Sequence, residues 1–467
     1  MHPSASTTSL TPWYSKHSLP LLLLMVLLSR LVFAFIVWKI NGPSGFISRD
    51  TDSYLQPARS LLYGSFLANG SFSLQGMPET FRTPGYPLLL APAVFFGHLV
   101  LIAVFENLLF AICSAWLLWQ IATELMHDSR TAIWAVIFYC FEPIGFLNCL
   151  KLLTETAFTT LFLAFVWILV RFLRGPTYSK LGLAALTLGA ATYVRPVSLY
   201  LGLFGVPLFF LFLRTLPWPK RISWAALFPV LFALTLSPWI LRNSSVAGLN
   251  SFSSIPDSNL YFYAAAAVEA KLHHRNFADV QKEWGIDPPY YFQIHEEQRA
   301  WSQGKIARFW RREATKTLGA HLPTYSLLHA RGCAMVMFNP AISEVLRDLG
   351  IYPNFGSPIS TKLEQGILPT IGWLLQEYPL AALLLPALLI QLLLYYWLGF
   401  AGLRRLPPDT RAFFAGLIVY FILISGIPGS SARYRAPFMP LICIAAGVAV
   451  TQWRKSRKPV AIEPAMC

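Results

Sequence analysis

Charged residues are scarce in this sequence of 467 residues. Asp, Glu, Lys and Arg make up 13% of it, about half of the usual ~25% in soluble globular proteins, and 55% of the residues are hydrophobic. This composition excludes a soluble enzyme and an intrinsically disordered chain. Acidic residues are scarcer than basic ones, which gives a formal net charge of +15 at pH 7. In a membrane protein such an excess lies in cytoplasmic linkers, so we do not predict nucleic acid as a partner.

Patterns for disulfides, metals and nucleotides are also missing. The six cysteines include no Cys-x-x-Cys pair, which argues against a disulfide framework and a structural zinc site. His295-Glu296 begins like a zinc-protease motif, but residue 299 is Arg instead of the second His. No glycine-rich phosphate-binding motif occurs. We therefore predict no metal-ligand set from the sequence, while the cofactors stay unknown and a divalent metal stays open.

Long apolar segments are abundant instead. A helix that crosses a bilayer needs ~20 mostly apolar residues, and the first such segment, 19–38, is too long for the apolar region of a signal peptide. The sequence therefore predicts an all-α polytopic membrane protein. We expect about ten transmembrane helices, at residues 18–40, 100–124, 131–148, 154–173, 180–195, 196–214, 222–240, 378–401, 411–428 and 436–453.

Basic residues in the short connections predict the topology. Alternate connections contain most of the Lys and Arg, for example Arg171 with Arg174 and Arg404 with Arg405. The positive-inside rule places these connections and both termini in the cytoplasm, and we expect a bacterial inner membrane. If residues 86–97 were a further span, the later basic connections would lie on the outer face. We therefore interpret residues 86–97 as an interfacial or re-entrant helix on the outer face.

This topology divides the chain into four parts. An N-terminal membrane module has seven spans and a large first outer loop, an outer-face segment follows, and a C-terminal module has three spans before a cytoplasmic tail. Their predicted bounds are 1–240 with its loop 41–99, then 241–377, 378–453 and 454–467.

The first outer loop contains two acids at the start of an amphipathic helix. Asp50 and Asp52 precede Tyr54, Ala58 and Leu62, which share one helical face. One interpretation is a helix cap with an exposed acid, because a helix N-terminus favours a carboxylate. The other is a general base at the membrane surface that takes a proton from an acceptor hydroxyl.

Further charged and aromatic residues lie at the predicted outer ends of the spans. Taken singly, each arginine could contact lipid headgroups and each acid could favour a helix N-terminus. Together they indicate an anionic lipid headgroup that reacts at the outer interface, because charge in a membrane is costly and usually functional. The candidate substrate-binding residues are Tyr54, Glu79, Arg82, Tyr86, Arg195, Arg242, Arg433 and Arg435, and Glu155 is a further catalytic candidate. Within the spans, we favour a structural pair between Arg30 and Glu106.

Five short motifs, in this order, resemble the GT-C glycosyltransferases, in particular the branch of protein O-mannosyltransferases and the lipid A aminoarabinose transferase. The motifs are Asp50-x-x-x-Tyr54-x-x-x-Ala58 with Gly64, Arg82-Thr-Pro-Gly-Tyr-Pro87, Leu153-Thr-Glu155, Pro238-Trp-Ile-Leu-Arg242-Asn243 and Arg433-Tyr434-Arg435-x-Pro437. The resemblance implies a polyprenyl-phosphate sugar donor, Asp50 as the base with Asp52 as the neighbouring alternative, Arg82 at the carrier phosphate and Glu155 as a second acid. Two positions depart from the family: Thr51 stands where many members have Glu, and Arg82 where the aminoarabinose branch has Lys.

We therefore expect a membrane glycosyltransferase that works by a single inverting displacement. The expected partners are a polyprenyl-phosphate-linked sugar, a glycolipid, polysaccharide or protein acceptor, and membrane lipids. A transporter or flippase of a lipid-linked sugar is an alternative, although we find no internal repeat. A non-catalytic envelope protein with a GT-C-like fold and a ligase for whole lipid-linked glycans also stay open.

Overall fold

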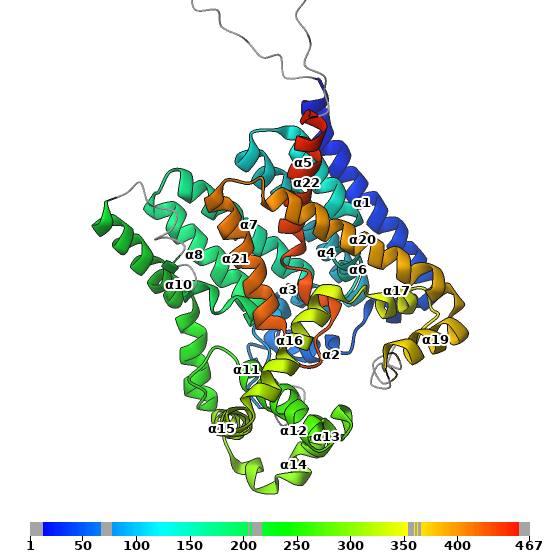
Figure 1. Ribbon diagram of the computed structural model, residues 1–467. Coiled ribbons are helices and arrows are strands. Elements are labelled where there is room, and N and C mark those ends of the chain that lie inside the picture. The colour runs from blue at the N-terminus through cyan, green and yellow to red at the C-terminus, as the bar shows by residue number, and fades with distance from the viewer. Residues whose placement is uncertain are drawn as a thin grey trace, which may run out of the picture.

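The computed structural model of the protein describes residues 13–66, 77–203, 206–207, 217–353, 359, 362 and 366–456. Within these residues the regular elements are helices, and no β-strand is formed (Figure 1). The predicted all-α architecture is therefore confirmed. Most of the predicted tail 454–467 lies outside the described residues, as does much of the predicted span 196–214, which begins with η2(Pro196–Ser198).

Six of the described helices are long and apolar enough to cross a membrane. They are α1(Trp13–Asn41), α4(Leu99–Met126), α7(Glu155–Arg174), α10(Trp218–Ala247), α20(Pro379–Leu403) and α21(Pro408–Ser425). Three predicted spans are α8(Tyr178–Val194), α22(Met439–Ser456) and the pair α5(Ser129–Phe141) and α6(Pro143–Asn148). Pro143 lacks an amide hydrogen and begins α6, while the Glu142 carboxylate accepts from Ile144 and Gly145 as its N-cap, so the 131–148 segment is broken. The structure thus describes a polytopic membrane protein, and the total of ten spans stays a prediction.

Helix α7 lies at the centre of the membrane bundle. In its most apolar window 72% of the residues are buried by protein, against 17% in the windows of α1 and α20. α7 packs against α4 and α8, and α22 packs against α5 and α20. Gly402 of α20 lies directly against the Ala445 carbonyl of α22, where a larger residue would keep the two helices apart. Because little of the α1 and α20 windows is buried by protein, these two helices present their apolar side chains to lipid.

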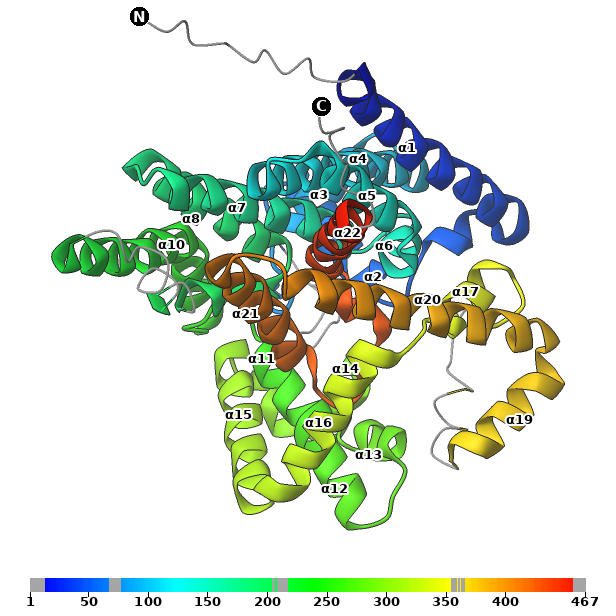
Figure 2. The same cartoon turned by 45° about the horizontal axis from the view of Figure 1, so that its top comes forward.

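The 241–377 segment folds into short helices that gather below the bundle in Figure 1. Their aromatic core includes Tyr261, Phe262, Tyr291 and Trp310. The start of α1 and the end of α22 lie at the opposite end of the molecule. α17 and α19 instead pack against α20 (Figure 2). The elements are α11(Ile255–Ser258), the π-helix η3(Asn259–Ala265), α12(Ala266–Leu272), α13(Phe277–Glu283), α14(Pro288–Ile294), η4(Glu296–Ala300), α15(Gln303–Ala320), α16(Leu322–Phe338), α17(Ile342–Asp348) and α19(Ile367–Glu377).

The first loop lies between the bundle and these short helices. It contains η1(Gly42–Phe46), the predicted amphipathic helix as α2(Thr51–Leu61), and the predicted interfacial helix as α3(Gly85–Phe95). α2 packs on α3, and α3 packs on α4 and α8. η5(Ala432–Arg435) follows α21 and packs on α16. The loop and the ends of several membrane helices thus meet in one region.

The predicted pair between Arg30 and Glu106 is wrong. The Arg30 guanidinium donates to the carbonyls of Val26 and Tyr139, at 3.3 and 3.5 Å, and lies 5.3 Å from the ring centre of Phe146. No ion pair joins it to Glu106, which is half-buried on α4, and both residues belong to the described part of the chain. Arg30 faces α5 and α6, so carbonyls and aromatic rings accommodate its charge in place of a carboxylate.

Candidate functional site

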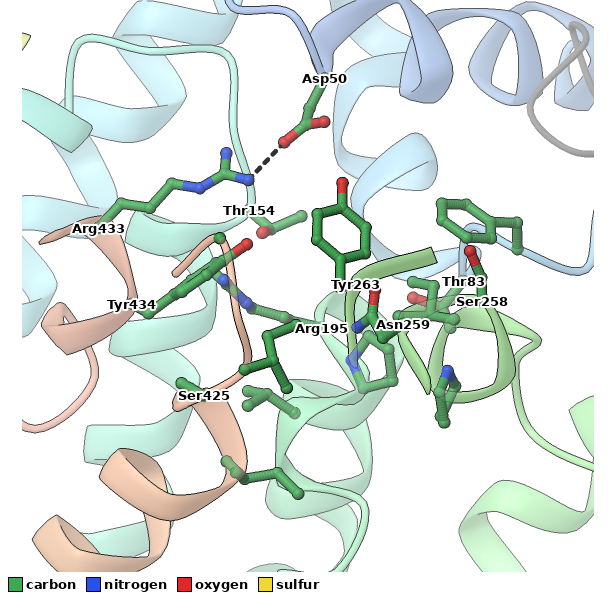
Figure 3. A pocket seen from close by; sticks show the side chains of 18 of the residues that line it. Asp50, Thr83, Thr154, Arg195, Ser258, Asn259, Tyr263, Ser425, Arg433 and Tyr434 are labelled. Atoms are coloured by element: carbon green, nitrogen blue, oxygen red, sulfur yellow. Dashed lines mark ion pairs between the residues drawn. The ribbon is translucent and has the colours of Figure 1, made fainter. Parts of the chain in front are cut away.

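A cavity of about 410 Å³ lies where the first loop, the 241–377 segment and the ends of the membrane helices meet. Its volume is within the range of ~300–1,000 Å³ that is usual for small-molecule sites. Figure 3 shows side chains from these separate parts of the chain converging on it. Six of the predicted site residues line it: Asp50, Tyr54, Arg82, Glu155, Arg195 and Arg433.

The five charged residues among them form a continuous chain of ion pairs. Asp50 binds Arg82 at 3.3 Å with one carboxylate oxygen and Arg433 at 2.7 Å with the other, and Figure 3 marks the second pair. Arg433 also lies 3.8 Å from Glu155, whose carboxylate is 2.7 Å from Arg195. Three guanidinium groups and two carboxylates leave one net positive charge in the cavity wall. A wall of this charge favours an anionic ligand, and guanidinium groups suit phosphate because they donate two hydrogen bonds in parallel.

The turn before α3 positions Arg82. The buried Glu79 carboxylate accepts hydrogen bonds from the backbone N–H groups of Phe81 and Arg82, at 2.6 and 2.9 Å. The Arg82 side chain then donates to the hydroxyls of Ser53 and Tyr54, at 2.8 and 3.0 Å. Both ends of Arg82 are thus fixed by hydrogen bonds, with its guanidinium beside α2.

A glycine at the start of α3 brings the second arginine close. A Cβ on Gly85 would lie 2.5 Å from the carbonyl carbon of Tyr193 and 2.6 Å from the amide nitrogen of Val194. Only a residue without a side chain permits this approach, which brings α3 against the end of α8. Arg195 follows directly, so the packing of two backbones sets the separation of Arg82 and Arg195.

Two acids near the cavity have pKa values shifted in opposite directions. Burial disfavours the charged form of Asp50, but Arg433 and Arg82 outweigh it and hold the pKa of that carboxyl well below its usual range. For Glu79, burial dominates and raises the pKa to about 7, although the Arg82 and Phe81 N–H groups favour its charged form. Asp50 is therefore ionised at neutral pH, whereas Glu79 titrates near it.

Aromatic residues complete the wall. The ring of Tyr434 lies between two guanidinium groups, with its centre 5.3 Å from Arg195 and 5.2 Å from Arg433. Tyr263 of η3 points its hydroxyl toward Asp50 in Figure 3, and Ser258 and Asn259 lie on the other side of the cavity. None of these four residues is among the site candidates predicted from the sequence. Tyr434 was visible within the Arg-Tyr-Arg motif, whereas the other three lie in a segment without a recognisable pattern.

Five predicted site residues, all of them described by the structure, do not line this cavity. Asp52 is exposed, so the geometry favours Asp50 of the two acids in the loop. Glu79 acts on the backbone of the Arg82 turn, as described above. Tyr86 is buried and packs edge-on against Tyr54, with ring centres 5.1 Å apart. Arg242 donates to the carbonyls of Glu79 and Phe66, at 2.5 and 3.0 Å, while the buried Arg435 donates to those of Asn339 and Val336. Glu79, Tyr86 and Arg242 thus contact Tyr54 or the turn that carries Arg82, whereas Arg435 joins η5 to the end of α16.

Metal ligands do not gather in the described part of the chain. Among those residues no group of three or more His, Cys, Asp or Glu side chains could hold a metal ion. Asp50 and Glu155 are bridged by Arg433, so their nearest charged partners are guanidinium groups.

Comparisons with known proteins find similarity to solved structures but not to known sequences. No protein-family model matches the sequence, and no curated protein matches it. The fold is similar to that of an oligosaccharyltransferase from Archaeoglobus fulgidus, crystallised while tethered by a disulfide bond to an acceptor peptide with the NVT sequon. The TM-score is 0.48 at 11% identity, and the alignment covers 92% of this chain and 50% of that one. This chain therefore spans about half the length of the protein it resembles.

Proposed function

We propose that the protein is an integral-membrane glycosyltransferase that moves a sugar from a polyprenyl-phosphate carrier to an acceptor hydroxyl at the outer face of the membrane. The observation that carries the proposal is the chain of ion pairs from Arg82 through Asp50, Arg433 and Glu155 to Arg195, which lines a cavity at the ends of membrane helices. Four of these five residues, all but Arg195, belong to the motifs that resemble those of GT-C transferases.

The arginines supply what a lipid-phosphate leaving group needs. As the bond from the sugar to the phosphate breaks, negative charge grows on a phosphate oxygen, and fixed guanidinium groups stabilise it. Arg82 is held by Ser53 and Tyr54, and Arg433 and Arg195 lie against Tyr434. The groups are in position before the donor arrives, so little reorganisation opposes the reaction.

We assign Asp50 as the general base. In the described structure its two arginine partners make it a weak base. A bound phosphate would draw on the same guanidinium groups, and its negative charge would raise the pKa of Asp50 toward that of a useful base. The acceptor oxygen then forms a bond to the anomeric carbon while its proton passes to Asp50. The carbon–oxygen bond to the phosphate breaks, and the lipid phosphate leaves with the electron pair.

The apolar part of the cavity suits the lipid. Leu423 and Ile424 line it from the end of α21, a helix long enough to span a membrane, and Val197 and Ile427 line it from the adjoining connections. An isoprenoid chain could pass from the phosphate to the bilayer along such side chains. We further propose that the 241–377 segment helps to select the acceptor, which could be a glycolipid, a polysaccharide or a protein.

The proposed membrane is a bacterial inner membrane, with both termini in the cytoplasm. Basic side chains at the other end of the bundle support this orientation. Arg171 at the end of α7 lies 3.6 Å from Glu124 of α4, and Arg454 at the end of α22 lies over the ring of Trp134. Cytoplasmic ends of membrane helices are enriched in such residues.

The test is a transfer assay in membranes, with extracted polyprenyl-phosphate sugars and native envelope acceptors. Wild type, Asp50→Asn and Asp52→Asn are compared at matched expression. We expect Asp50→Asn to lower transfer about 100-fold or more, as for loss of a general base. Asp52→Asn is the matched control, since it removes the same charge from an exposed residue outside the cavity.

Each other outcome has a definite meaning. Equal transfer by wild type and Asp50→Asn would refute the base assignment. If wild type consumes no donor but carries labelled lipid-linked sugar between leaflets, the protein is a transporter and the proposed function is wrong.

A further inference from the structure

We infer that the sugar on the donor is itself uncharged, and is neither a sugar with a free amino group nor a uronic acid. The inference rests on the proposed function and specifies its substrate class. It comes from the balance of charge in the cavity wall and from the chemistry of the side chains that remain free there.

The ion-pair chain accounts for nearly all of the charge in the wall. Among the described lining residues the carboxylates are Asp50 and Glu155 and the guanidinium groups are those of Arg82, Arg195 and Arg433, which leaves one net positive charge. A sugar linked to a lipid through a single phosphate is a phosphodiester with one negative charge. Its binding would bring the total to zero. A further charge on the sugar would then be uncompensated, and uncompensated charge is costly away from water.

The carboxylates of the wall are already engaged. Asp50 binds Arg433 at 2.7 Å and Arg82 at 3.3 Å, and Glu155 is 2.7 Å from Arg195. An ammonium group on the sugar would have to compete with Arg195 for Glu155, or it would bind the Asp50 carboxylate that the phosphate releases and block it as a base. A uronate would have to compete with the phosphate for the arginines. A neutral sugar avoids both conflicts.

The rest of the polar lining suits hydroxyl groups. Thr83, Ser258, Asn259 and Tyr263 line the cavity, and within the described part of the chain their side chains form no hydrogen bond. Figure 3 shows Thr83, Ser258 and Asn259 together on the side away from Arg433. Hydroxyl and amide groups both donate and accept, as do the hydroxyls of a sugar. The cavity thus has a cationic part for the phosphate and a neutral hydrogen-bonding part for the sugar.

Two further groups near the cavity can carry charge. His329 of α16 lines it, and its Nδ1 lies 3.4 Å from the Tyr325 hydroxyl. Arg49 is exposed and is not part of the lining, so solvent screens its charge. A His329→Gln variant is therefore compared with wild type using the same sugar probes, and its preference for a neutral sugar is expected to persist.

Binding to the purified full-length protein tests the inference independently of the acceptor. The probes are short-chain polyprenyl phosphodiesters that differ only in the sugar: a neutral hexose, an amino sugar that is cationic at pH 7, and a uronic acid. Polyprenyl phosphate without sugar is the fourth probe. We expect the neutral conjugate to bind at least about tenfold more tightly than either charged one, the loss expected from an unpaired buried charge. Equal or tighter binding of a charged conjugate would overturn the inference while leaving the transferase proposal intact.

A variant that removes one charge from the wall makes the test more specific. Arg195→Gln removes one positive charge from the wall, so the preference should shift toward the cationic sugar by about tenfold or more. Arg312→Gln is the matched control, because the Arg312 side chain is 73% exposed and lies outside the lining, so its loss should leave the preference unchanged. A preference that Arg195→Gln does not move would show that the ion-pair chain does not set it. If no probe binds, including the sugar-free phosphate, the proposed function itself fails.

Discussion

Replacing Glu79 by Gln is expected to stabilise the protein at neutral pH and to lower its activity. The Glu79 side chain is fully buried, and one of its carboxylate oxygens has no hydrogen-bond partner. The other accepts from the N–H groups of Phe81 and Arg82. Burial raises the pKa of Glu79 to about 7, against the opposing effect of these bonds and of the Arg82 charge. Gln keeps the accepting oxygen and the shape of the side chain but removes the buried charge.

The size of the effect follows from the pKa shift. A folded pKa of about 7 against 4.5 in the unfolded chain means that the folded protein binds the proton more tightly. At about 1.4 kcal/mol for each pKa unit, the shift corresponds to about 3 kcal/mol. Protonated Glu79 therefore contributes to the stability of the folded wild type. This contribution is fully present below pH 4.5 and is lost as the pH rises through 7, because the wild type then holds a buried charge. The difference in free energy of unfolding, variant minus wild type, should therefore rise by about 2 kcal/mol between pH 5 and 7 and level off above pH 7.

The assay compares unfolding of the two purified proteins in the same detergent from pH 5 to 8. In the difference between the two free energies of unfolding, the contributions of titrating groups that both proteins share cancel. Glu296→Gln is the control, since it makes the same replacement at an exposed side chain and removes no buried charge, so no comparable rise is expected. A level difference for Glu79→Gln as well would refute the reasoning. Transfer should meanwhile fall about tenfold, because hydrogen bonds to a neutral amide hold the Arg82 turn less firmly than bonds to a carboxylate.

Two further predictions concern the arginines of the cavity. Gly85→Ala would force α3 away from the end of α8 and shift Arg195, so transfer should fall at least about tenfold. The control is Gly182→Ala, on the partner helix α8, which should leave transfer unchanged because nothing lies within 4 Å of the added methyl group. Similar activity of the two variants would argue against this packing as the cause. Tyr434→Leu removes the ring between Arg195 and Arg433 and should weaken donor binding about 5- to 30-fold, from ~0.5–1 kcal/mol for each cation–π contact. Tyr434→Phe should retain most of the affinity, and equal weakening in both variants would assign the effect to the hydroxyl.

The sequence could predict the helical membrane architecture and six of the lining residues for a simple physical reason. Apolar length marks a membrane helix, and every second connection of a polytopic bundle lies on the same face of the membrane. Asp50, Arg82, Glu155, Arg195 and Arg433 all lie in or beside such connections. Charged residues from distant parts of the chain were therefore expected on one face before any packing was known.

The direction of each side chain could not be predicted in the same way. Arg30 and Glu106 lie in neighbouring apolar helices, but Arg30 faces Tyr139 and Phe146, and the helix rotation that decides this depends on packing. Tyr263 and Asn259 belong to a π-helix, whose hydrogen-bonding pattern has no clear sequence signature. In the predicted span 131–148, Pro143 was visible, but the end of α5 was decided by the Glu142 cap.

Five arginines that look alike in the sequence are separated by the partners they find. Arg242 and Arg435 donate to backbone carbonyls, which are fixed parts of the fold. Their guanidinium groups therefore stabilise the backbone segments that they contact. Arg82, Arg195 and Arg433 instead pair with carboxylates that line a cavity. A phosphate competes with a carboxylate on equal terms, because both offer anionic oxygens to the same donors. In the proposed reaction, arginines with acidic partners are therefore the ones that a lipid phosphate recruits, and the acid it displaces becomes free to accept a proton.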